Sequence, residues 1–510
     1  MKTGQGDDIR DDDDRGGNRR TDRATAGARG RVVVIGGGLT GLVAARRIAE
    51  RAQSLRRPIE VVVLEAKDRV GGAIWTDHVD GFTLEGGADS FITNKPWAVD
   101  LCRALGLGDQ LIGTDEHHRR SFVVGKGRLL PVPEGFVLMS PRRLMPLLTS
   151  PILSWKGKIR ALMDLVLPRK ADESDESLAS FVKRRLGREA LDRLVQPLVG
   201  GIYTADPNDL SLKATLPQYQ AMEREHGSLI RAGLRQARLG KGVDANASGA
   251  RYGLFVSLID GMDTLPRALA ASLPDGALRL RSPVRRVGRP DSKSEGLWRV
   301  DMLDGPPIDA AAVVVATESH ASARLLDGLD PELALHLRSI PYASSAIVNI
   351  AFRRDQIAHP LDGFGVVVPA IENRGILAVS FTSVKFPSRA PAGTVLMRVF
   401  VGGATQPHLF DLDDAAMLDL VRAELADLIG TTGEPILARV GRHARAMPQY
   451  TLGHLDRVEA IQTKAARHSG LILAGNAFHG VGVPDCVRSG ELAAEAVLVA
   501  LADPANIAAA

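Results

Sequence analysis

Apolar runs and turn residues alternate along the first part of the chain in the order that a parallel α/β sheet requires. Residues 32–35 are four consecutive apolar β-formers, which predict a strand buried on both faces of the sheet. The glycine-rich segment GGGLTG, residues 36–41, follows at once and predicts a tight turn into a helix. A second apolar run, residues 61–64, predicts the next strand, which ends at Glu65.

Later apolar runs predict more of the same sheet and a second sheet. Residues 311–317 and 470–476 predict two further strands of the first sheet, and a helix is expected to start near Pro484. Residues 348–352, 364–368, 377–381 and 395–401 carry the β-formers of an antiparallel second sheet. Residues 96–205 are mostly helical in pattern, with one helix at 177–186 and another at 189–196, ahead of Pro197.

The turn after the first strand has the spacing of a dinucleotide site. Gly36 allows the tight turn, Gly38 lets the backbone approach a pyrophosphate, and Gly41 lets the helix pack close to the strand. The helix from Leu39 then offers unpaired N–H groups and its positive dipole end to phosphates. Glu65 stands where a carboxylate binds a ribose hydroxyl, so the sequence predicts a bound dinucleotide.

The residues after Glu65 favour a flavin over a nicotinamide. Arg69, Gly71 and Gly72 put a guanidinium and bare backbone just beyond the second strand, where they could neutralise a pyrophosphate and let a flat ring pass. The alternative is a surface turn with a solvated arginine. Near the other end of the chain, a helix starting at Pro484 would point its dipole at a reduced flavin. The glycine pair at residues 86–87 also suggests backbone close to a ligand.

Composition excludes several other classes. The chain has 510 residues, 45% of them hydrophobic, and a net charge of +4, which is ordinary for a soluble globular protein and does not indicate nucleic-acid binding. Two cysteines without a CxxC motif indicate neither disulfides nor a zinc site, and they fit a reducing cytoplasm. Residues 1–30 lack an apolar run, so we expect a disordered tail and no signal peptide.

One segment leaves its function open. Residues 131–170 are rich in Leu, Met and Pro and place Trp155 among several cations, as an interfacial membrane segment does. The alternative, which we favour, is a helical lid whose apolar face lines the active site. Elsewhere no apolar stretch is long enough to span a bilayer.

From residue 31 to about 501 the sequence resembles the oxygen-dependent protoporphyrinogen/coproporphyrinogen oxidases of the flavin amine oxidase superfamily. VVVIGGGLTGL and EAKDRVGGAIWT are shared across the superfamily, whereas DGFTLEGGADSF, GGIYTADPNDLSL, FPSRAPAG and GNAFHGVGVPDCVRSG are closer to the porphyrinogen oxidases. The resemblance implies an FAD enzyme that removes six electrons from a porphyrinogen in three rounds. Each round would pass two electrons to O2 and yield H2O2, as a step of heme biosynthesis.

The resemblance also implies site residues. The FAD contacts would be Gly36, Gly38, Leu39, Thr40, Gly41, Glu65, Arg69, Gly71, Gly72, Val284, Gly475, Val481 and Val483. Lys95 matches a cation that faces a substrate propionate, and the other substrate contacts would be Gly201, Val367, Phe381 and Phe400. No protein side chain is assigned as a catalyst, because the flavin performs the chemistry.

These inferences combine into one expected organisation. The fold class is α/β, with a Rossmann-like FAD-binding domain (31–95, 252–320 and 441–502) built from both ends of the chain. A helical lid or membrane-associating domain (96–205) and a mixed-sheet substrate domain (206–251 and 321–440) complete it. The expected location is the cytoplasm, with peripheral contact to the inner face of the membrane and a homodimer left open. A flavin amine oxidase and a non-catalytic binding protein of this fold remain as alternative functions.

Overall fold

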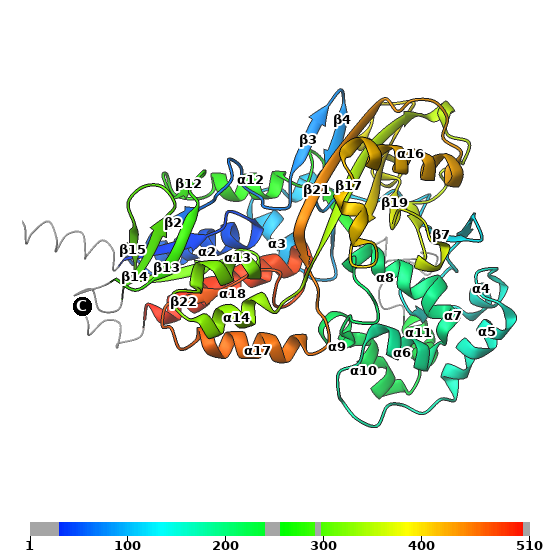
Figure 1. Cartoon of the computed structure of the whole chain (residues 1–510), viewed down its shortest axis with the longest axis horizontal. Coiled ribbons are helices and arrows are strands. Elements are labelled where there is room, and N and C mark those ends of the chain that lie inside the picture. The colour runs from blue at the N-terminus through cyan, green and yellow to red at the C-terminus, as the bar shows by residue number, and fades with distance from the viewer. Residues whose placement is uncertain (1–29, 240–254, 291–296, 503–510) are drawn as a thin grey trace, which may run out of the picture.

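The computed structural model describes residues 30–239, 255–290 and 297–502. The predicted disordered tail therefore lies outside the described residues, apart from Gly30. Figure 1 shows three parts: a nucleotide part that contains both ends of the described chain, a large twisted sheet, and a group of helices beneath that sheet.

The nucleotide part is built on a five-stranded parallel sheet in the order β12-β2-β1-β16-β22. Its strands are β1 (Arg31–Ile35), β2 (Glu60–Leu64), β12 (Leu278–Arg279), β16 (Ala312–Val315) and β22 (Leu471–Leu473). Every strand predicted for this sheet is present. Strands from the beginning, middle and end of the chain lie side by side, which confirms the predicted Rossmann-like architecture.

Helices cover both faces of this sheet because alternate residues of its buried strands point to opposite sides. Val32 and Val34 pack in one apolar core with α2 (Leu39–Ser54) and α18 (Val483–Ala500). Val33 and Ile35 pack in another with α13 (Ser319–Leu326), α14 (Pro331–Arg338) and α17 (His454–Ala465). Smaller elements of this part are β5 (Phe91–Ile92), α3 (Trp97–Ala104), β6 (Leu111–Gly113), β11 (Phe255–Leu258), α12 (Thr264–Ala271) and the sheet β13 (Val284–Gly288), β14 (Trp298–Met302) and β15 (Ile308–Ala310).

The second sheet has seven strands in the order β21-β17-β20-β19-β18-β7-β8. They are β7 (Phe122–Gly125), β8 (Arg128–Pro131), β17 (Tyr342–Arg353), β18 (Gly365–Val367), β19 (Ala378–Ser380), β20 (Thr394–Gly402) and β21 (Leu437–Pro448), and α16 (Asp414–Ile429) covers one face. All four predicted strands are present, although the sheet is not purely antiparallel, because β18 pairs with β7 in parallel. The hairpin β3 (Thr76–Val79) and β4 (Phe82–Glu85) lies beside it (Figure 1).

Most of the chain from residue 144 to residue 238 forms the helical group. It contains α4 (Leu144–Thr149), α5 (Trp155–Leu162), the short turn η2 (Met163–Leu165), α6 (Leu178–Arg185), α7 (Arg188–Ala190), α8 (Gln196–Tyr203), α9 (Leu212–Thr215), α10 (Pro217–His226) and α11 (Leu229–Arg238). A fully buried ion pair, Arg185 with Asp164, lies inside it, and Ser228 and the Ile230 N–H also bond the carboxylate. The buried charges are thus fully hydrogen-bonded.

The structure corrects three sequence predictions in this region. Residues 96–141 contain β6 to β8 and the short pair β9 (Phe136–Val137) and β10 (Ser140–Pro141), because runs too short to stand out pair with other strands. The helix does not end before Pro197, since a π-helical turn, η3 (Leu191–Val195), precedes α8 and places the proline in its first turn. Leu212, Tyr219 and Leu229 pack in the helical core, so residues 206–239 were wrongly assigned to the substrate sheet. No described helix is long and apolar enough to cross a bilayer.

Candidate functional site

The first glycine-rich turn has almost no room for side chains. Gly36 has φ +109°, and a Cβ there would lie 2.7 Å from the Ala316 carbonyl oxygen of the neighbouring strand. A Cβ on Gly41 would lie 1.9 Å from the Gly36 carbonyl oxygen. The turn therefore needs glycine at both positions, as the sequence predicts.

A second glycine-rich turn lies directly against the first. The Gly71 N–H donates to the Gly37 carbonyl oxygen over 2.9 Å, and a Cβ on Gly72 would lie 3.3 Å from the Gly38 Cα. No side chain caps the N-terminus of α2, whose first residues are Leu39 and Thr40. Bare backbone from two turns and free N–H groups of a helix start thus meet at one place, which suits a phosphate.

The Glu65 carboxylate closes one side of these turns. Its two oxygens accept hydrogen bonds from the Gly37 N–H over 2.7 Å and from the Lys67 N–H over 2.8 Å. A carboxylate has about four acceptor positions, so each oxygen can still accept a hydroxyl. Arg69 donates to the carbonyl oxygens of residues 70, 72 and 74, so its guanidinium fixes the second turn.

Two later segments of the chain reach the same edge of the sheet. The Ser282 N–H donates to the Glu65 carbonyl oxygen over 2.8 Å, which brings Val284 at the start of β13 near that acid. Gly475, with φ +127°, follows β22, and its N–H donates to Ser489 on α18 over 2.9 Å.

The N-terminus of α18 lies beside that of α2. Thr40 donates its hydroxyl to the Cys486 carbonyl oxygen over 3.2 Å. Val483 is the first residue of α18, and Val481 lies in the loop before it. Gly482 leaves this helix start without a side-chain cap as well. Two uncapped helix starts therefore share the carboxyl edge of the sheet, where ligands of such folds bind.

Three of the expected substrate residues lie near one another on the face of the second sheet that is turned away from α16. Val367 pairs with Ala378, which pairs with Phe400, and side chains of paired residues point to the same face. A Cβ on Gly201 of α8 would lie 3.8 Å from Val367. Gly201 is exposed and the other two are half-buried, so this row is an accessible apolar surface.

Phe381 does not belong to that row. Its side chain is fully buried in the core between the sheet and α16, together with Val379 and Val399. Alternate residues of a strand point to opposite faces, so Phe381 follows Val379 into the core while Ala378 faces the row. The structure thus separates Phe381 from the other expected substrate residues.

Lys95 is paired with an acid that the sequence analysis did not select. Its Nζ lies 2.6 and 2.8 Å from the two carboxylate oxygens of Asp485, in the first turn of α18. The structure therefore places Lys95 beside the α18 start. It does not record Lys95 in contact with the apolar row.

A cluster of buried charges lies beside that row. Arg398, two residues before Phe400, contacts Asp89, and Lys385 Nζ lies 3.2 Å from the same carboxylate. Although burial opposes it, the two cations hold the pKa of Asp89 well below its usual range. Burial raises the pKa of Glu85 and lowers that of Lys385. These side chains fix the segment around residue 87 on the sheet.

The glycine pair at residues 86–87 has a different role from the predicted one. A Cβ on Gly86 would lie 1.7 Å from the Trp75 ring, and one on Gly87 would lie 2.0 Å from the Ala73 carbonyl oxygen. These glycines are needed for contacts within the protein. These contacts alone explain why residues 86 and 87 are glycine, without a nearby ligand.

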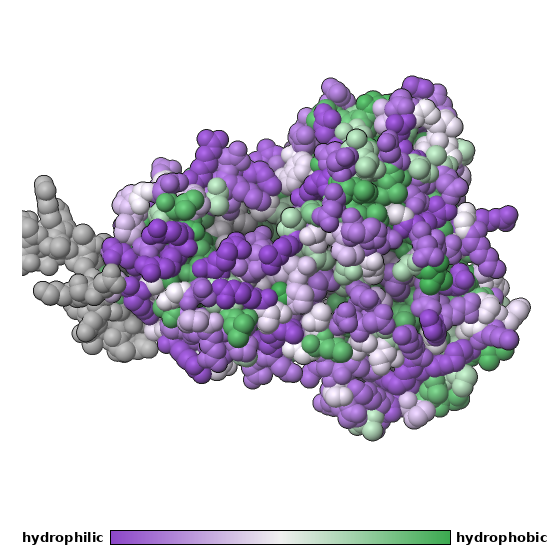
Figure 2. All heavy atoms as spheres, viewed as in Figure 1, coloured by the Kyte–Doolittle hydropathy of each residue, from purple (hydrophilic) through white to green (hydrophobic). Residues whose placement is uncertain are grey.

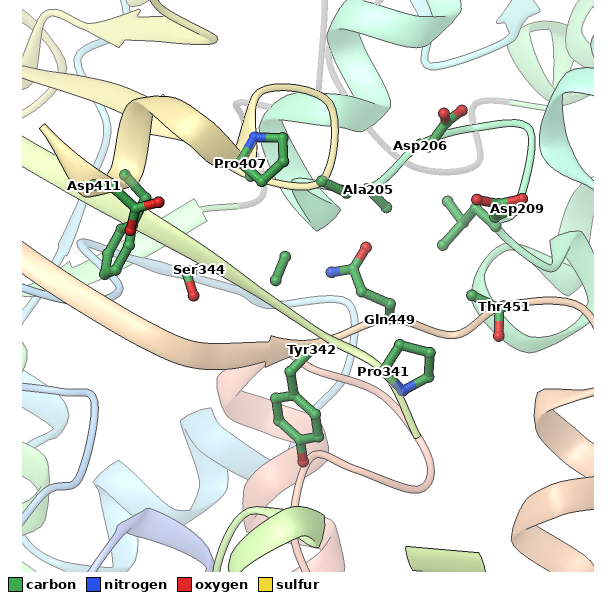
Figure 3. A pocket seen from close by; sticks show the side chains of 15 residues that line it. Ala205, Asp206, Asp209, Pro341, Tyr342, Ser344, Pro407, Asp411, Gln449 and Thr451 are labelled. Carbon is green, nitrogen blue, oxygen red and sulfur yellow. The ribbon is translucent and has the colours of Figure 1, made fainter. Parts of the chain in front are cut away.

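A cavity in the described part of the chain lies away from the glycine-rich turns. It has a volume of about 470 Å³ and lies between the end of α8, the start of β17 and the end of β21 (Figure 3). Asp206, Asp209 and Asp411 line it, and none of the expected site residues does. An acidic lining disfavours the phosphates of a dinucleotide, so we place the cofactor at the glycine-rich turns. The described residues contain no group of three His, Cys, Asp or Glu side chains suited to a metal.

Comparison with protein families gives the cofactor class. The family model described as flavin containing amine oxidoreductase matches residues 39–498. The chain belongs to this family. Its fold, with a nucleotide sheet from both chain ends and a mixed second sheet, is that of the family's solved structures.

FAD is therefore the cofactor, and the residues present fit it. The uncapped start of α2 and the facing glycines 38 and 72 can hold the pyrophosphate, while the free acceptor positions of Glu65 can bind a ribose. The uncapped start of α18 can face the flavin ring.

Three relatives are similar over nearly the whole chain. The coproporphyrinogen III oxidase of Propionibacterium freudenreichii is 36% identical, covering 92% of this chain and 90% of its own. The coproporphyrinogen III oxidase of Bacillus subtilis is 33% identical, covering 92% and 98%. A crystal structure assigned as a protoporphyrinogen oxidase from Exiguobacterium is 31% identical, with a TM-score of 0.80 over 92% of this chain and 98% of that one.

The sequence analysis missed Asp485. It also missed the buried charges beside the second sheet, which are Asp89, Lys385 and Arg398. Asp485 could have been selected, because an acid in the first turn of a helix after a proline is a recognised position. Its partnership with Lys95 could not, because 390 residues separate them.

Proposed function

We propose that the protein oxidises a porphyrinogen to the porphyrin with FAD and O2, forming H2O2, in heme biosynthesis. The observation that carries this proposal is end-to-end similarity to two coproporphyrinogen III oxidases at 33% and 36% identity. A plant protoporphyrinogen oxidase from Arabidopsis thaliana is 28% identical. We therefore infer coproporphyrinogen III as the preferred substrate.

The chain's own groups would bind and orient, and bound FAD would accept the hydride. Gly201, Val367 and Phe400 would contact the apolar macrocycle, since they form an accessible apolar row. Lys95 would attract a propionate of the substrate. The two uncapped helix starts would hold the phosphates and the flavin ring by N–H donation.

The test is turnover of both porphyrinogens by the purified protein. Porphyrin fluorescence and H2O2 would be followed with coproporphyrinogen III and protoporphyrinogen IX, and we expect the higher kcat/KM for coproporphyrinogen III. Faster oxidation of protoporphyrinogen IX would reverse the inferred preference. If the protein oxidises putrescine or another amine and neither porphyrinogen, an amine oxidase is favoured. A purified protein without flavin colour would favour a non-catalytic role.

We also propose that the helical group contacts membranes peripherally, in place of the lid that the sequence favoured, because several of its apolar side chains face solvent. Trp155 is 71% and Val166 is 78% exposed, and Met145, Ile159 and Met163 are exposed beside them on α4, α5 and η2. Figure 2 shows apolar surface at the outer edge of this group. Nearby cations, Lys156 and Arg169 among them, would attract anionic lipid. The homodimer stays a prediction.

Vesicle binding distinguishes this surface from the lid alternative. The wild-type protein is expected to sediment with vesicles that contain phosphatidylglycerol and to bind weakly to phosphatidylcholine alone. Trp155→Glu with Val166→Glu should abolish binding, because charge on the apolar face opposes insertion. Leu335→Glu is the control, since this residue is also exposed but lies on α14 of the nucleotide part. Equal binding by all three proteins would exclude the surface.

A further inference from the structure

Lys95 and Asp485 form a short, two-pronged ion pair beside the start of α18. Nζ lies 2.6 and 2.8 Å from the two carboxylate oxygens, and these are the hydrogen bonds of Lys95 within the described part of the chain. The lysine side chain is 39% exposed and the aspartate 12%. One partner is therefore accessible to solvent and the other is largely enclosed.

Asp485 lies close to the loop that precedes its helix. A Cβ on Gly480 would lie 2.4 Å from the Asp485 Cγ, and one on Gly482 would lie 3.2 Å from its Oδ2. Gly480 has φ +90°, a conformation that glycine adopts without strain. The carboxylate thus lies against the loop that carries Val481, and at 12% exposure it has little room to move.

Lys95 is not held in the same way. Its ammonium has three donors, and its four-carbon stem is flexible and partly exposed. It can turn toward another anion while Asp485 stays where it is. The two residues therefore differ in mobility as well as in exposure.

We propose that Asp485 is a specificity-determining residue that competes with a substrate carboxylate for Lys95. This inference rests on the proposed function, which assigns a carboxylate-bearing substrate to the site. An anionic ligand must displace a fixed anion to reach the ammonium, so the ion pair lowers the affinity for every ligand that uses Lys95. A neutral ligand cannot replace the Asp485 carboxylate at the Lys95 ammonium, so it does not bind Lys95.

The competition predicts opposite effects for the two partners. Asp485→Asn removes the competing charge with little change of shape, so a carboxylate ligand should bind about two- to fivefold more tightly. Lys95→Ala should weaken binding by a similar factor. In the Lys95→Ala background, Asp485→Asn should have no effect, because the contested cation is gone.

The experiment uses four FAD-loaded proteins: the wild type, Asp485→Asn, Lys95→Ala and the double variant. Each is titrated with coproporphyrin III, which carries four carboxylates, and with its tetramethyl ester, which carries none. Binding is followed by quenching of porphyrin fluorescence, and flavin content and the melting temperature of each protein are measured in parallel. We expect the substitutions to change affinity for the acid and not for the ester, with differences that shrink at high salt. Arg103→Ala is the control, because this exposed cation also pairs with an aspartate but lies on α3.

Two results would overturn the proposal. If Asp485→Asn and Lys95→Ala weaken acid binding equally and both lower flavin content, the ion pair only holds the loop. If Lys95→Ala leaves the affinity for coproporphyrin III unchanged, Lys95 does not bind a ligand carboxylate. This conclusion holds even if Asp485→Asn fails to fold. Porphyrinogen turnover by the wild-type protein is scored separately, so a failed function and a failed competition give different results.

Discussion

Glu65 joins the first glycine-rich turn to the loop after β2 through its bonds to the N–H groups of residues 37 and 67. Glu65→Ala should weaken FAD binding at least tenfold, since hydrogen bonds to a charged acceptor contribute about 1.5–3 kcal/mol each. Flavin retained after dialysis measures this effect. Glu60→Ala is the control, because Glu60 lies on the same strand and its side chain pairs with Arg31 at the surface. Full flavin retention by Glu65→Ala would remove Glu65 from the site.

His454 makes stability depend on pH. It is fully buried, and its Nε2–H donates to the Phe478 carbonyl oxygen over 3.0 Å, while Nδ1 has no partner among the described residues. Burial lowers the pKa of His454 to about 4, so the folded protein keeps it neutral while the unfolded chain protonates near pH 6.5. The stabilisation is complete above pH 6.5 and is lost as the pH falls toward 4.

The matching measurement is the free energy of unfolding at pH 7 and pH 5. We expect the wild-type protein to lose about 2 kcal/mol more than His454→Gln over this interval, because the variant has no group to protonate. His408→Gln, at an exposed position, should behave like the wild type. An unchanged pH slope in His454→Gln would show that another group is responsible.

At the residue scale, the sequence predicted the residues of a local motif and missed contacts between residues that are far apart in the chain. Gly36, Gly41 and Glu65 follow from a local motif, and the geometry explains each of them. The partnership of Lys95 with Asp485 joins distant segments, and no pattern in either segment indicates it. Phe381 was selected through the family resemblance alone, which does not say to which face of the sheet its side chain points, and the structure buries it in the core.

At the element scale, strands with long apolar runs were predictable and short ones were not. β1, β16 and β20 are found where the sequence places them. β7 has four residues and is defined mainly by its pairing with β8 and β18, which the sequence does not show. The helix through Pro197 was missed because a π-helical turn has no simple sequence signal.

The helical group depends on the buried pair between Arg185 of α6 and Asp164 of η2. Arg185→Met should lower the free energy of unfolding by about 3–5 kcal/mol, because the aspartate would stay buried without its cation. Chemical denaturation measures the change. Arg188→Met should change it by less than about 0.5 kcal/mol, since Arg188 is 84% exposed and its ion pair lies on the surface. Similar losses in both variants would contradict the importance of burial.

At the scale of the whole molecule, Gly490 joins the two ends of the chain. A Cβ there would lie 2.5 Å from the Thr40 carbonyl oxygen and 2.8 Å from the Val43 Cβ, so α18 packs on α2 only with glycine at this position. Gly490→Val should push the two helices apart and lower the flavin content. It should also lower the free energy of unfolding by about 1–3 kcal/mol, which is the typical cost of overpacking a core.

Melting temperature and flavin absorbance report the two effects together. Leu492→Ala is the control, because Leu492 is exposed on the same helix and should change neither. Normal flavin content in Gly490→Val would show that the cofactor site tolerates separation of the two helices.

The position of β22 also determines when the protein can take up its flavin during synthesis. A ribosome makes β1, α2, β2 and β16 long before β22 and α18, which are the last described strand and helix. Until residues 471–473 emerge, the all-valine stretch of β16 has no neighbour on one side and is an open, apolar strand edge. We therefore expect the nascent chain to need protection from aggregation from the completion of β16 until β22 emerges, and flavin capture to follow only after the final helix has docked.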